Sequence, residues 1–181
     1  SDHGYGLAWF QQKRVNGKAT FEQRWIETEY PSIHTMTLAD LDGDGQLELI
    51  AGKQMFAHNG QDAGSYEPQF IFYYTFQGDR AQRHIITYTP VAQYFGPDAD
   101  PKRPPPTDII GLGMRVNAAD MDGDGRNDII IAAKSGLFIF YNQGVPTRVR
   151  ASIPGFLPPR ESYPGNYMWD APQPARLPAG R

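Results

Sequence analysis

The 181-residue sequence contains no cysteine, no long apolar run and no block of like charges. Without cysteine there are no disulfides, no cysteine-ligated zinc and no thiol catalysis, although this absence does not distinguish a cytosolic chain from a secreted one. Carboxylate and main-chain oxygens remain as the obvious metal ligands. No apolar run approaches the roughly 18 residues that a spanning helix needs, so we expect no membrane span.

The charge balance gives little indication of a partner. Lys and Arg number 17 and Asp and Glu number 20, for a net charge of -3. Because no run of five or six basic residues occurs, we expect neither nucleic acid nor an anionic membrane as the main partner. No basic and apolar leader precedes the first expected strand, so localisation has to be inferred indirectly.

An internal repeat is the strongest feature of the sequence. Residues 39–50 read ADLDGDGQLELI, and residues 119–130, which begin 80 positions later, read ADMDGDGRNDII. Seven of the twelve positions are identical, which indicates a duplicated structural unit.

The segments around both copies favour strands, and no segment shows a persuasive helical period. Turn-forming Gly, Asn, Asp and Pro separate the candidates. The sequence therefore predicts an all-β chain. Apart from the runs that follow the two acidic loops, the expected strands are residues 6–11, 20–27, 35–38, 69–76, 83–89, 115–118 and 136–141.

Proline marks two segments that do not suit a sheet interior. Residues 95–106 carry five prolines, which predicts a long surface loop. Residues 145–181 carry eight of the sixteen prolines and are expected to form an extended tail, docked by aromatic side chains such as Tyr163, Tyr167 and Trp169.

The acidic loops have the ligand spacing that a hard cation requires. Positions one, three, five and nine offer carboxylates and position seven offers a main-chain carbonyl. The predicted ligands are Asp40, Asp42, Asp44, Gln46 and Glu48 in one loop, and Asp120, Asp122, Asp124, Arg126 and Asp128 in the other. Since Arg126 would contribute a backbone oxygen, we expect its guanidinium to point outward.

Calcium is the cation that these loops favour, with two sites expected. Flexible loops with mixed carboxylate and carbonyl oxygens suit a large ion with irregular coordination, and neither loop offers a histidine to a transition metal. An EF-hand is excluded because its twelfth position should be Glu and is Ala51 or Ile131 here. The alternative is that Asp-Gly-Asp-Gly is a polar hairpin turn.

At these residues the sequence resembles the FG-GAP and VCBS-type repeat family, with Glu48 standing where Asp is usual. The resemblance implies β-propeller blades of four antiparallel strands, with calcium in the loop between the first two strands of a blade. On this basis residues 1–144 form the repeat segment, with repeats around 33–89 and 109–144. Residues 6–27, 33–89 and 109–141 would supply two, four and three strands, which do not close a propeller.

The function expected from these features is binding rather than chemistry. We expect a calcium-binding scaffold or protein-interaction module, part of a larger extracytoplasmic (periplasmic or secreted) assembly, where millimolar calcium fills loops of modest affinity. No catalytic residue is assigned.

A more distant resemblance, to the propeller of sugar-converting aldos-2-ulose dehydratases, implies an alternative, namely a fragment of a carbohydrate-active lyase or dehydratase. Two features of the residues would serve such an enzyme. One is a metal site built from the histidines. The other is a set of aromatic side chains that could stack on sugar. The histidines are His3, His34, His58 and His84, and the aromatic residues are Trp9, Trp25, Tyr73, Tyr74 and Trp169.

Overall fold

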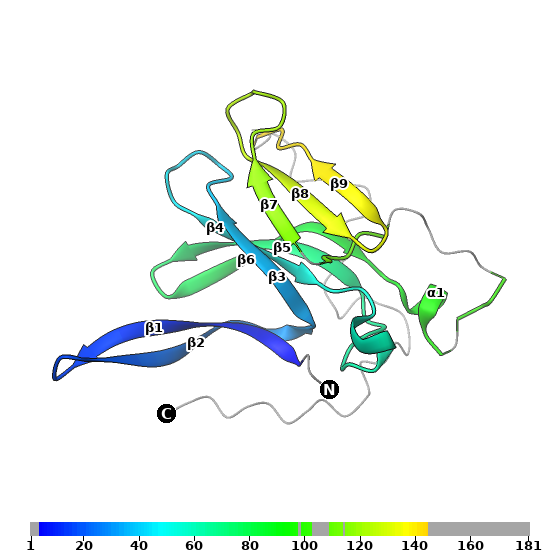
Figure 1. Ribbon diagram of the computed structural model, residues 1–181, viewed down its shortest axis with the longest axis horizontal. Helices are drawn as coiled ribbons and strands as arrows, with labels where there is room; N and C mark the ends of the chain where they lie inside the picture. Colours follow the sequence, from blue (N-terminus) through cyan, green and yellow to red (C-terminus); the bar gives the residue numbers. More distant parts are fainter. Residues whose placement is uncertain (1–3, 98, 103–108, 114, 145–181) are drawn as a thin grey trace.

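The computed structural model describes residues 4–97, 99–102, 109–113 and 115–144. Within these residues nine strands form three antiparallel sheets of two, four and three strands (Figure 1). The all-β prediction is therefore confirmed, and so is the expected grouping of the strands. The predicted tail at 145–181 and part of the predicted loop at 95–106 lie outside the described residues.

The first sheet is a long hairpin of β1 (Tyr5–Val15) and β2 (Lys18–Pro31). Its turn is Asn16-Gly17, and both residues have positive φ, 50° and 79°, as a type I′ turn requires. Both strands are longer than the sequence predicted. The distal half of the hairpin is exposed on both faces, so no alternation of buried and exposed residues marks its length.

The other two sheets follow in chain order. The second has the order β3-β4-β5-β6 and the third has the order β7-β8-β9. Their bounds are β3 Ile33–Ala39, β4 Glu48–Lys53, β5 Gln69–Gln77, β6 Arg80–Thr89, β7 Arg115–Ala119, β8 Asp128–Ala133 and β9 Gly136–Phe140.

Among the described residues, two four-residue helices lie in connections, a 3₁₀ helix at Ala57–Gly60 and α1 at Ala92–Phe95. Four residues are too few to show a helical period, which is why the sequence did not reveal them. In the described part of the chain, no helix has the length and apolar character needed to cross a membrane.

The middle of the β3–β6 sheet is covered on both faces, and β4 is buried along its whole length. On one face Ile50 packs in a cluster with residues of the β7–β9 sheet, and on the other Leu49 packs in a cluster that β2 also joins. Successive strand residues point to opposite faces, so one strand serves both cores. The three sheets are thus stacked, and β3 contacts β7.

A buried lysine ties the long β4–β5 connection to the sheet. The Lys53 side chain is fully buried, and its Nζ donates to the carbonyl oxygens of Ser65 at 3.2 Å and Glu67 at 2.9 Å. Burial lowers the pKa of Lys53 to about 7, against the opposing effect of the Glu67 charge. The folded chain therefore releases a proton near neutral pH that an unfolded lysine keeps until about pH 10.4.

We expect stability to rise with pH above neutrality because of Lys53. Between pH 7.5 and 9.5 the unfolded chain binds the extra proton, so the free energy of unfolding should increase by about 1 kcal/mol per pH unit. Urea titrations at several pH values measure this slope. The variant Lys53→Met should lose it while Lys18→Met, on the exposed hairpin, keeps it; a flat profile in the unmodified chain contradicts the assignment.

Candidate metal centre

The two acidic loops occupy equivalent positions in consecutive sheets. The first loop, residues 40–47, joins β3 to β4, and the second loop, residues 120–127, joins β7 to β8. The residue after each loop, Glu48 or Asp128, opens the next strand with a buried carboxylate. The duplicated sequence thus forms a duplicated local structure.

Each loop brings three carboxylates together. In each group one oxygen per residue lies within 4.8 Å of the others. The first group is Asp40, Asp42 and Glu48, and the second is Asp120, Asp122 and Asp128. Two acidic clusters able to hold a metal ion are therefore present where the sequence predicted them. Asp44 and Asp124 are not members of these groups.

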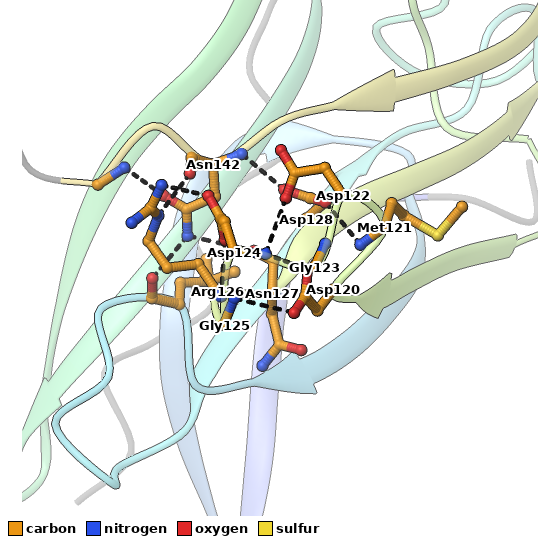
Figure 2. A network of polar contacts seen from close by, with 12 residues as sticks. Asp120, Met121, Asp122, Gly123, Asp124, Gly125, Arg126, Asn127, Asp128 and Asn142 are labelled. Carbon is orange, nitrogen blue, oxygen red and sulfur yellow. Dashed lines mark hydrogen bonds and ion pairs between the residues drawn. The ribbon is translucent and has the colours of Figure 1, made fainter.

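Main-chain amides hold the first carboxylate of each loop in the same way. One oxygen of Asp40 accepts the Gly43 N–H at 2.7 Å and the other accepts the Gly45 N–H at 3.0 Å. In the second loop Asp120 accepts from Gly123 at 2.7 Å and Gly125 at 2.9 Å (Figure 2). The four glycines have φ between 80° and 88°, a conformation that glycine adopts most readily.

In each loop the buried carboxylate, Glu48 or Asp128, accepts a hydrogen bond from the main-chain N–H of the second residue of the loop. The Leu41 N–H donates to Glu48 Oε2 at 2.7 Å, and the Met121 N–H donates to Asp128 Oδ2 at 2.8 Å. The other oxygen of Asp128 accepts the Asn142 N–H at 2.8 Å. The final acidic position therefore both shapes the loop and offers a ligand.

The electrostatics of the first loop show a repulsion between carboxylates that a bound cation would reduce. Burial raises the pKa of Glu48, and the charges of Asp42, Asp44 and Asp40 raise it further. By contrast, hydrogen bonds from main-chain amides, led by Gly125, lower the pKa of Asp120. A carboxylate buried among like charges is a position that a bound cation stabilises.

The side chain of Arg126 is 42% exposed, and its guanidinium lies against the edge of the second loop. Its guanidinium forms an ion pair with Asp124, and its Nε donates to the Asn142 carbonyl oxygen at 2.7 Å (Figure 2). The sequence did not reveal the two acceptors that hold this guanidinium. In the first loop, Gln46 Nε2 donates to Asp44 Oδ2 at 3.1 Å without bringing a charge.

Removing the Arg126 guanidinium should strengthen the binding of a divalent cation at the second acidic cluster. The variant Arg126→Gln, which copies the first loop, is expected to raise its affinity about 3- to 10-fold, because a guanidinium repels a nearby divalent ion. Calorimetric calcium titration measures the change, with Arg115→Gln on β7 as the control. An affinity that is unchanged or weaker contradicts the prediction.

The three histidines that the structure describes do not join either acidic group. His58 Nδ1 lies 2.8 Å from Asp62 Oδ2, and the His84 ring stacks on Tyr73 with centroids 4.5 Å apart. His34 lies on β3, and His3 lies outside the described residues. Within the described part of the chain the candidate metal groups contain only Asp and Glu, so the histidine alternative gains no geometric support.

The aromatic residues considered for carbohydrate binding are mostly engaged elsewhere. Tyr74 is buried, and Tyr73 is stacked on a histidine. Trp9 and Trp25 on the hairpin are 36% and 41% exposed. Trp169 lies outside the described residues. Of this set, the two hairpin tryptophans are therefore the accessible ones in the described chain.

Sequence reasoning missed two residues that contact the loops. Asn127 and Asn142 send side-chain amides to the main chain of the first loop. Nothing in the local pattern showed that either residue reaches another sheet.

Comparison with known proteins adds no relative. No protein-family model, no curated protein and no solved structure matches the chain. Fold and site therefore define the class by themselves: an all-β chain of stacked antiparallel sheets with two acidic clusters that could hold metal ions.

Proposed function

We propose that the chain is a calcium-binding β-propeller repeat segment. The stacking of three antiparallel sheets in chain order, with a complete four-stranded sheet in the middle, supports this architecture. The acidic loops follow the first strand of two consecutive sheets, which is the position that the resemblance to FG-GAP and VCBS-type repeats implies. Each sheet is then one blade or part of one.

The observation that carries the cation-binding proposal is the repeated hydrogen-bond pattern of the loops. Two segments 80 residues apart hold their carboxylates with amides at the same positions, and both end on a buried acid. Three carboxylates within 4.8 Å repel one another when no cation lies between them. Cation binding would relieve this repulsion, which links it to the stability of the fold.

Calcium fits the loops better than magnesium. The ligand sets expected from the sequence combine carboxylates with one main-chain carbonyl in each loop, and calcium accepts such irregular oxygen sets at about 2.3–2.6 Å. Magnesium demands near-ideal octahedral geometry and keeps several waters. Because loops of modest affinity are filled at millimolar calcium, the proposed setting of the protein is outside the cytoplasm.

The proposed role is to bind another protein as part of a larger assembly. Phe10, Phe21 and Trp25 on the hairpin are 60%, 64% and 41% exposed. Phe10 pairs with Gln23, Phe21 with Gln12 and Trp25 with Ala8, which puts all three aromatic residues on one face. Clustered apolar side chains at a surface are typical of interaction sites.

Calcium stoichiometry tests the proposal. Calorimetric titration of the whole chain should find two ions per chain. The variants Asp42→Asn and Asp122→Asn should each bind one ion, since the amide keeps a carbonyl oxygen for the loop amide but loses the charge. Asp79→Asn, in the exposed β5–β6 turn, should still bind two. No binding by the unmodified chain, or two ions in all variants, contradicts the proposal.

A further inference from the structure

Two side-chain amides cross from the β7–β9 sheet to the first acidic loop. Asn127 Nδ2 donates to the Asp40 carbonyl oxygen at 2.8 Å, and Asn142 Nδ2 donates to the Leu41 carbonyl oxygen at 2.7 Å. These bonds join residues 87 and 101 positions apart in the chain. Asn127 lies in the second acidic loop and Asn142 follows the end of β9, and both contact the first two residues of the first loop.

These contacts connect the two buried carboxylates through consecutive hydrogen bonds. Asp128 Oδ1 accepts the main-chain N–H of Asn142 at 2.8 Å, and the side chain of Asn142 binds the Leu41 carbonyl. The main-chain N–H of the same residue, Leu41, donates to Glu48 Oε2 at 2.7 Å. Asn142 therefore touches both candidate sites, one through its backbone and the other through its side chain.

The same residue also stabilises the end of the second loop. Asn142 Nδ2 donates to the Asn127 carbonyl oxygen at 3.1 Å, and the Asn142 carbonyl oxygen accepts Arg126 Nε at 2.7 Å (Figure 2). A change in the order of the second loop consequently changes how well Asn142 is held. It also changes how well the amide is presented to the first loop.

The first loop has no equivalent group at the position of Asn127. Eighty residues earlier the sequence has Leu47, whose side chain is 54% exposed. The polar bridge is therefore a property of the second repeat and not a general feature of the loop sequence. Replacing Asn127 by leucine restores the residue that the first repeat carries.

We propose that the two loops bind divalent cations cooperatively, with Asn142 as the positioning residue that couples them. This inference rests on the proposed function. An ion in the second loop fixes Asp128 and its bond to Asn142, which in turn fixes the Leu41–Asp42 peptide, next to the Leu41 N–H that Glu48 accepts. The first loop then loses less conformational freedom when it binds its own ion. By linkage, an ion in the first loop raises the affinity of the second by the same factor.

Calcium titration of the full chain and of single-site variants measures this factor. Asp42→Asn leaves the second site and Asp122→Asn leaves the first, so each gives one association constant. The coupling factor is the overall two-ion constant of the unmodified chain divided by the product of these two constants. We expect a factor of about 5 or more.

Two variants that remove the side-chain amides test whether these amides carry the coupling. For each, the coupling factor is measured again with Asp42→Asn and with Asp122→Asn added separately. Asn142→Ala removes the side-chain donor but keeps the main-chain N–H that Asp128 accepts, and Asn127→Leu is a second, independent variant. Both should lower the coupling factor, Asn142→Ala to about 1, while Asn117→Ala, at an exposed position of β7, leaves it unchanged. Amide hydrogen exchange at Gly43 and Gly45 should quicken in Asn142→Ala even in chelator.

Three other results would each contradict one part of the inference. Two ions bound with a factor near 1 overturn the coupling and leave calcium binding intact. A factor that survives both Asn142→Ala and Asn127→Leu overturns the role of the amides. No ion bound by the unmodified chain overturns the proposed function, and the coupling with it.

Discussion

Replacing Asp128 by asparagine should weaken both the fold and the proposed cation site of the second loop. The Asp128 side chain is fully buried, and its two oxygens accept the main-chain N–H groups of Met121 and Asn142, each at 2.8 Å. An amide offers only one acceptor, so its NH₂ group must face one of these N–H donors. We expect a loss of about 1–3 kcal/mol in the free energy of unfolding, measured in chelator by urea titration.

In calcium the same variant should lose more stability than in chelator, because the second loop also loses a charged ligand. The difference between the two conditions isolates the contribution of the ion from that of the hydrogen bonds. Asp79→Asn, which changes an exposed carboxylate outside the loops, should change neither value by more than about 0.5 kcal/mol. Equal stability of Asp128→Asn and the unmodified chain in both conditions contradicts the described site.

Replacing Gly52 by alanine should destabilise the protein without affecting cation binding. A Cβ at this position of β4 would lie 2.6 Å from the Phe70 carbonyl oxygen and 2.7 Å from Leu112 Cδ1. β4 pairs with strands on both sides, so its backbone has little room to move. Overpacking of this kind costs about 1–3 kcal/mol, measurable by urea titration.

The loss at Gly52 should be the same in calcium and in chelator, because the residue lies in the core away from both loops. Gly4→Ala is the matched control, since a Cβ there would meet nothing within 4 Å. Equal stability of Gly52→Ala and Gly4→Ala would show that the contact between β4 and the 109–113 segment is looser than described.

The repeat made much of the fold predictable from sequence. Two copies of Asp-Gly-Asp-Gly, each with strand-like flanks, indicated equivalent hairpins, and the structure has them between β3 and β4 and between β7 and β8. The buried acids were also predictable, because Glu48 and Asp128 occupy the ninth position of each loop. Local patterns were sufficient here because these contacts lie within one hairpin.

The features that sequence missed depend on contacts between distant segments or on exposed structure. The bonds from Asn127 and Asn142 to the first loop require the relative placement of two sheets. The orientation of Arg126 depends on the Asn142 carbonyl oxygen, 16 residues further along the chain. Along the distal part of the β1–β2 hairpin no buried face exists to set a pattern, although Asn16-Gly17 signals its turn.

Thermal unfolding in excess calcium, compared with excess chelator and with excess magnesium, tests the central claim most directly. A cation that binds the folded loops must stabilise the fold, by about 5 kcal/mol for two sites at a free calcium concentration 100-fold above Kd. We predict a rise in Tm that is large in calcium and much smaller in magnesium. The same Tm in calcium and in chelator would contradict the account and leave the two Asp-Gly-Asp-Gly segments as turns.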